Sequence, residues 1–142
     1  MIRGGWQRRR ASSLIVETGV ALVSMTRGLD FLSGNDSPAA VVGLAGNIIP
    51  LCGWGFMFIS GSSLVLIAML GRWGWLAIGA HILLSGVFVT TGIGVIAELG
   101  FGTDFRVWSA LLIFGLVIHG GFILSIVTVI STHEGEIPPE EL

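Results

Sequence analysis

The chain has 142 residues, of which 53% are hydrophobic and only 11% charged, and its formal net charge is −2. A soluble domain of this size needs more polar surface to cover its core, so the composition excludes an ordinary soluble fold. The negative charge argues against a nucleic-acid partner. The composition therefore predicts a small protein of the lipid bilayer.

Four apolar stretches account for most of the length, at residues 12–32, 50–70, 73–97 and 107–131. A helix needs about 20 apolar residues to cross a bilayer. The fold class is therefore predicted to be all-α, with four transmembrane helices in an antiparallel bundle at residues 12–131. A basic segment (1–11) precedes this domain and an acidic tail (132–142) follows it.

The first stretch begins after Arg8-Arg9-Arg10, as a secretory signal does, but Glu17, Arg27 and Asp30 interrupt it. We therefore expect an uncleaved first membrane helix. A loop follows at 33–38, and residues 39–49 are too short an apolar segment to span.

The second stretch opens with Pro50, which suits the first turn of a helix because its missing N–H would be unpaired there. Cys52, the only cysteine, is predicted to be a small buried hydrophobe. Gly71-Arg72 predicts a tight turn, and so short a connection makes the second and third helices an antiparallel hairpin. A loop is expected at 98–106.

Arginines set the predicted orientation, because basic residues near short loops stay in the cytoplasm. The basic residues number seven, and all are arginine. Arg3, the three arginines at 8–10 and Arg72 fall on one side of a four-span protein. Both termini are therefore predicted to be cytoplasmic, in the bacterial cytoplasmic (inner) membrane. Five tryptophans near the span ends are expected to anchor in the headgroups: Trp6, Trp54, Trp73, Trp75 and Trp108.

Intramembrane polar residues are the candidate contacts between helices. Glu17 is costly inside a bilayer unless it is paired, protonated or hydrated. His81 falls at a similar depth, so the two can pair, either to relay protons or to hold helices together. The alternative is that Glu17 reaches the cytoplasmic headgroups. His119, near the middle of the last span, shares a stripe with Gly115 and Phe122 and is expected to bond a neighbouring helix.

Arg27 is deep for a headgroup charge, and an interhelical pair with Glu98 is an alternative to an exposed cluster. Small residues such as those at 60–63 favour close helix packing, either within one bundle or between copies. No catalytic or cofactor motif is present, and His residues without nearby Cys or carboxylates are a weak metal signal. We expect a non-enzyme with no catalytic residue, cofactor or metal.

The chain combines a basic start, a polar outer loop, Pro50 with Trp54-Gly55, Phe58 and Gly61, a turn at Arg72, and Ala80-His81. This combination resembles small four-helix membrane proteins of actinobacterial phages, some of which are holin-like. The resemblance covers about residues 8–131. It implies homo-oligomers that permeabilise the cytoplasmic membrane and release endolysin. Many holins end in a basic tail, whereas this tail is acidic.

Two other functions remain open on the sequence. One is a non-pore membrane adaptor or infection-exclusion protein, with a protein partner bound by the N-terminal arginine cluster or the acidic tail. The other is a small redox-associated four-helix membrane protein, which would carry a quinone or a partner enzyme. Induced expression separates the holin-like function from these two, because only a holin is expected to kill the cell.

Overall fold

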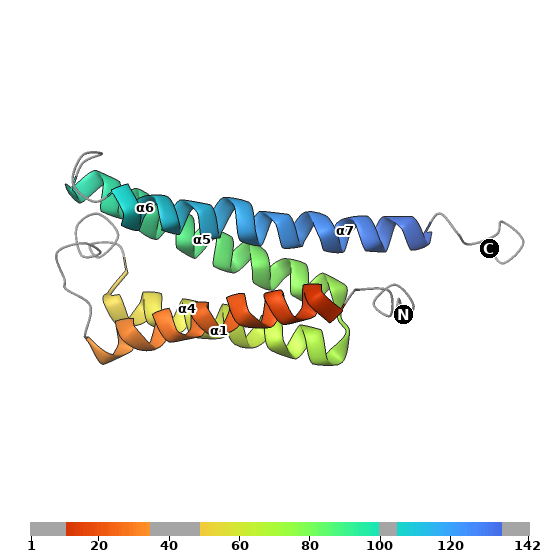
Figure 1. Ribbon diagram of the computed structural model, residues 1–142. Coiled ribbons are helices and arrows are strands. Elements are labelled where there is room, and N and C mark those ends of the chain that lie inside the picture. The colour runs from red at the N-terminus through yellow and green to blue at the C-terminus, as the bar shows by residue number, and fades with distance from the viewer. Residues whose placement is uncertain (1–10, 35–48, 100–104, 135–142) are drawn as a thin grey trace, which may run out of the picture.

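The computed structural model describes residues 11–34, 49–99 and 105–134, and these ranges are helical apart from short turns. The helices are α1 (Ala11–Ser33), α4 (Leu51–Gly71) and α5 (Gly74–Leu99), followed by α6 (Phe105–Leu112), the π-helical segment η2 (Ile113–His119) and α7 (Gly120–Glu134). The last three run end to end as one rod (Figure 1). The predicted all-α class is confirmed.

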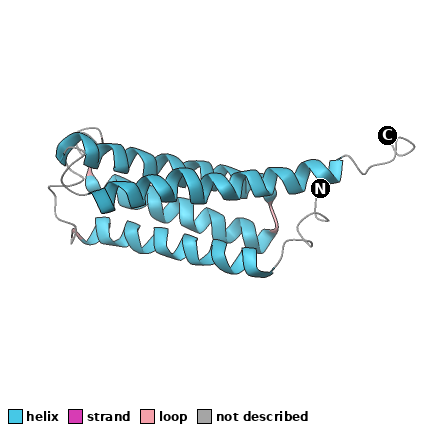
Figure 2. Ribbon diagram, turned by 45° about the horizontal axis from the view of Figure 1, so that its top comes forward, coloured by secondary structure: helices cyan, strands magenta, loops and turns pink. Residues whose placement is uncertain are grey.

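The helical rods lie side by side, and the chain reverses direction from each to the next (Figures 1 and 2). α1 packs on α4, α4 on α5, and α5 on the rod formed by α6, η2 and α7. The first turn of α1 and the last turn of α7 lie at the same end of the molecule in Figure 1. Packing between consecutive helices is what short connections favour.

Three helical stretches in the described part of the chain are long and apolar enough to cross a membrane: Leu51–Gly71, Gly74–Ala97 and Ser109–Ser131. A multi-pass membrane protein is therefore supported. α1 is 23 residues long but is not among them. Its three charged residues and several hydroxyl side chains lower its hydropathy, so α1 has the length of the predicted first span, but its membrane crossing stays a prediction.

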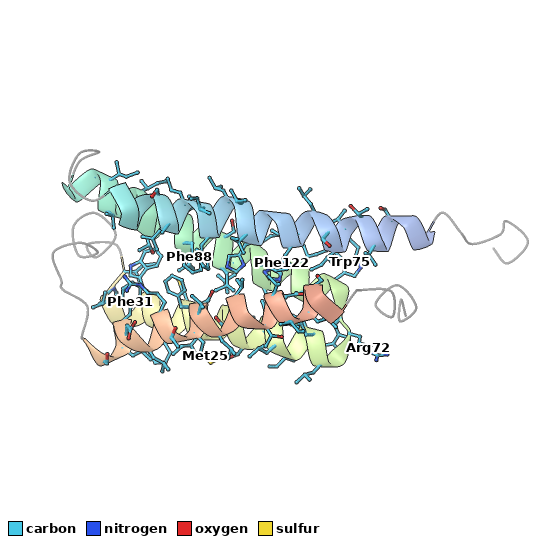
Figure 3. All side chains as sticks on the ribbon, viewed as in Figure 1. Met25, Phe31, Arg72, Trp75, Phe88 and Phe122 are labelled. Carbon is cyan, nitrogen blue, oxygen red and sulfur yellow. The ribbon has the colours of Figure 1, made fainter. Side chains whose placement is uncertain are left out.

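The turn between α4 and α5 forms as predicted. Arg72 takes a left-handed conformation (φ 57°), its N–H donates to the carbonyl of Met69, and the N–H of Trp73 donates to the carbonyl of Ala68. This pair of bonds is the Schellman motif, which satisfies carbonyls at a helix C-terminus. Figure 3 shows Arg72 at this end of the hairpin.

Several details correct the sequence predictions. Cys52, in the first turn of α4, is exposed and not buried as expected. Trp54 is buried in the core and does not lie free at a span end, whereas Trp73 and Trp75 are about half exposed or more. Glu98 belongs to α5 and not to a loop. The described residues do not include the side chains of Trp6 and Trp108, nor residues 39–48 of the predicted 39–49 segment.

The core is built around aromatic rings contributed by three helices. Phe31, Phe58 and Phe88 contact one another in series, the first pair tilted at a centroid distance of 5.6 Å and the second edge-to-face at 4.8 Å. Figure 3 shows Phe31 and Phe88 between the helices. Buried hydroxyls do not need partners on other helices, because Ser24, Ser62 and Thr91 each donate to the carbonyl four residues earlier.

Glycines separate into two groups by what surrounds them. A Cβ at Gly28 would lie 2.8 Å from the carbonyl oxygen of Gly55, and one at Gly61 would lie 2.8 Å from the Leu84 side chain. These glycines allow the helices of one chain to approach closely. A second group has nothing within 4 Å of the added Cβ, and its helical members are Gly19, Gly79, Gly86, Gly120 and Gly121. The small residues therefore serve packing within the chain at some positions and lie on its outer surface at others.

Candidate functional site

Three buried titratable side chains from three helices meet inside the molecule: Glu17 of α1, His81 of α5 and His119 at the end of η2. Their exposed fractions are 0%, 1% and 0%. The Oε1 atom of Glu17 lies 3.0 Å from Nε2 of His81, and Nδ1 of His81 lies 2.9 Å from Nδ1 of His119. We call this hydrogen-bonded chain the Glu–His–His centre.

Helical periodicity brings the three residues inward. Glu17 shares the buried face of α1 with Ala21, Ser24 and Phe31, at successive intervals of four, three and seven residues. At ~1.5 Å per residue, Glu17 lies about 9 Å along α1 and His81 about 10 Å along α5. The two helices begin at the same end in Figure 1, so the residues reach the same depth. The sequence left two possibilities for Glu17, a contact with His81 or a position at the headgroups; the structure has the contact with His81, and Glu17 does not extend to the surface.

The π-helical segment supports the position of His119. In a π-helix each N–H bonds the carbonyl five residues earlier, so the turn is wider than in an α-helix. At the end of the segment the N–H of Gly120 donates to the carbonyl of Val117. The carbonyl five residues before Gly120 is that of Gly115, and it accepts a hydrogen bond from the Ser85 hydroxyl of α5, at 2.8 Å. This bond ties η2 to α5 one turn from His119, which bonds the neighbouring helix as the sequence predicts.

Aromatic rings enclose the histidines. His81 stacks on Phe122 at 5.0 Å between centroids, and His119 stacks on Phe88 at 5.5 Å. Figure 3 shows Phe88 and Phe122 along the interface between the last rod and the rest of the molecule. Apolar walls strengthen hydrogen bonds by lowering the local dielectric, and they make an unpaired polar atom costly. In the sequence, these walls are indicated only by the helical stripe that places Phe122 near His119.

One polar atom of the centre has no partner. Within the described part of the chain, Nε2 of His119 is buried and makes no hydrogen bond. Buried polar atoms in folded proteins are nearly always satisfied, so each exception calls for an explanation such as catalysis, proton exchange or bound solvent. The centre therefore has a closed end at Glu17 and an open end at His119.

The other two candidate residues lie apart from the centre. The Arg27 guanidinium lies over the Phe31 ring, 4.6 Å from its centroid. This is a cation–π geometry, which adds favourable electrostatic energy to a half-buried arginine. The Glu98 side chain is outside the described residues, so the predicted pair between it and Arg27 stays a prediction. Among the described residues, no group of three or more His, Cys, Asp or Glu side chains is arranged to hold a metal ion.

Comparisons with known proteins do not extend these observations. No protein-family model matches the chain, and neither the curated proteins nor the solved structures contain a match.

Proposed function

We propose that this protein is a holin-like protein of the bacterial cytoplasmic membrane, which assembles into oligomers and permeabilises that membrane. In this proposal the four helical rods form an antiparallel transmembrane bundle with both termini in the cytoplasm. α1 crosses the bilayer with the other three, and its carboxylate is accommodated by the Glu–His–His centre.

The observation that carries the proposal is the exposed face of the last span. In the apolar 18-residue window of Ser109–Ser131 only 22% of the residues are buried, compared with 50% in that of Gly74–Ala97. Its large exposed side chains are apolar, with Leu116 and Leu124 60% and 70% exposed, and Gly121 adds open space beside them. In a bilayer, helices associate through close packing at small residues, because lipid is as apolar as leucine. This face suits contact between copies of the chain.

Induced expression in a bacterium with a membrane-potential dye tests the proposal. We expect abrupt depolarisation and growth arrest at a reproducible time after induction. Normal growth with an intact potential, at membrane levels confirmed by immunoblot, would contradict it. That outcome would support the adaptor function, and pull-downs with the N-terminal arginine segment and the acidic tail would then identify a partner.

A matched pair of variants locates the contact between copies. Gly121→Leu should delay or abolish depolarisation, because Gly121 is exposed with nothing within 4 Å of an added Cβ, and the larger side chain would block a neighbour's approach. Gly79→Leu, also open but on α5, is the control and should keep the wild-type timing. Equal timing in all three proteins would exclude the last span as the contact surface.

The single cysteine tests the proposed orientation. Cys52 is exposed and begins α4, which places it on the outer side when both termini are cytoplasmic. We expect a membrane-impermeant maleimide to label it in intact spheroplasts. In the variant Cys52→Ser/Arg72→Cys the thiol lies at the opposite end of α4, so labelling should require lysis. The reverse pattern would place the termini outside.

A further inference from the structure

The open end of the Glu–His–His centre has chemical consequences that follow from the two ring nitrogens of histidine. A neutral imidazole has one N–H donor and one bare acceptor nitrogen. His81 uses both nitrogens in the centre, Nε2 toward Glu17 and Nδ1 toward His119. Its tautomer therefore determines the direction of every hydrogen bond in the chain.

One direction follows when Glu17 is ionised. The carboxylate only accepts, so the Nε2–H of His81 donates to it and Nδ1 of His81 is bare. His119 must then donate its Nδ1–H to His81, across the 2.9 Å contact. Nε2 of His119 is left as a bare lone pair, and the centre carries one negative charge.

The opposite direction follows when one proton binds to that lone pair. His119 gains an N–H bond at Nε2 and passes its Nδ1 proton to Nδ1 of His81. His81 in turn passes its Nε2 proton to Oε1 of Glu17. Both rings end neutral with their protons on the other nitrogen, Glu17 ends as a carboxylic acid, and the net charge of the centre rises from −1 to 0.

We infer that the Glu–His–His centre is a binding site for a single proton, with Nε2 of His119 as its entry point and Glu17 as the final acceptor. The buried carboxylate gives the reason for uptake, because an ionised carboxylate is expensive at membrane depth and a neutral acid is not. The site does not depend on the proposed permeabilisation, since it uses only contacts within one chain.

No other described titratable group faces this centre. On α1, Arg27 and Asp30 lie ten and thirteen residues beyond Glu17, or about 15 and 20 Å along the helix. The buried face of α4 contains no titratable residue, and Cys52 and Arg72 lie at its two ends. On the last rod, His133 and Glu134 lie in the final turn. Among the described side chains, the titratable groups at this depth are therefore those of the centre itself.

Nitrogen NMR of ¹⁵N-histidine-labelled protein in lipid nanodiscs tests the inference directly. The full chain with His133→Asn contains only His81 and His119, so two rings are observed. As the pH falls, we expect His119 to change from the Nδ1–H to the Nε2–H tautomer without becoming an imidazolium, and His81 to reverse with the same midpoint. A His119 that keeps one tautomer, or that becomes doubly protonated, would overturn the inference.

Infrared spectroscopy follows the other end of the chain. A carboxylic-acid C=O band should appear at the midpoint seen by NMR, and Glu17→Gln should lack both this band and the coupled reversal of the two rings. A reversal without the band would overturn the transfer to Glu17. The wild-type titration is decisive by itself if Glu17→Gln fails to fold. Neither measurement requires pore formation, so the inference can fail or stand independently of the holin proposal.

Discussion

Replacing His81 with leucine is expected to lower the free energy of unfolding by about 3–5 kcal/mol, because breaking a buried ion or hydrogen-bonded pair leaves its partner desolvated. Glu17 and His81 are 0% and 1% exposed and 3.0 Å apart. The substitution removes the donor or acceptor facing Oε1 and also the partner of His119 Nδ1. Unfolding by SDS in mixed micelles, followed by tryptophan fluorescence, measures the loss.

The double variant Glu17→Leu/His81→Leu is the matched control. Two apolar side chains of suitable volume often replace a buried pair at little cost. We therefore expect the double variant to be more stable than His81→Leu alone. A double variant as unstable as the sum of the two single variants would show that the pair makes no coupled contribution.

The positions of the helices could be predicted from the sequence because apolar runs and turn residues are local signals. The predicted second and third stretches, 50–70 and 73–97, agree closely with α4 and α5. Gly71-Arg72 predicted the hairpin, although the left-handed residue is Arg72 and not the glycine. Depth along two helices that start at the same end places Glu17 and His81 at the same level, but it does not decide between a contact of the two residues and a Glu17 that reaches the headgroups.

The complete centre could not be predicted, because it depends on rotation of the last rod about its axis. The apolar run at 107–131 predicts a regular helix, but in the structure η2 adds a wider turn that ends at His119. A π-helical turn changes which face later residues present, and no local motif marked it here. The same limit applies to glycines, whose inward or outward position depends on how the helices pack.

Gly28→Ala is expected to destabilise the protein by about 1–3 kcal/mol, a typical cost of overpacking. Its Cβ would lie 2.8 Å from the Gly55 carbonyl oxygen and from Cγ1 of Ile59, and 3.0 Å from Cβ of Phe58. Gly55 is equally restricted, since its own added Cβ would lie 2.8 Å from the Gly28 carbonyl. Because both contacts involve backbone, α1 and α4 must separate to accept the methyl group. The same SDS titration measures this loss.

Gly19→Ala on the same helix is the control, with the opposite sign expected. Nothing lies within 4 Å of a Cβ at Gly19, so only helix propensity changes, and alanine is favoured there by about 0.5–1 kcal/mol. Propensity alone would make both variants more stable. If Gly28→Ala is as stable as Gly19→Ala, α1 does not pack closely on α4. Loss at Gly28 with gain at Gly19 would establish the contact that holds α1, and therefore Glu17, against the other helices.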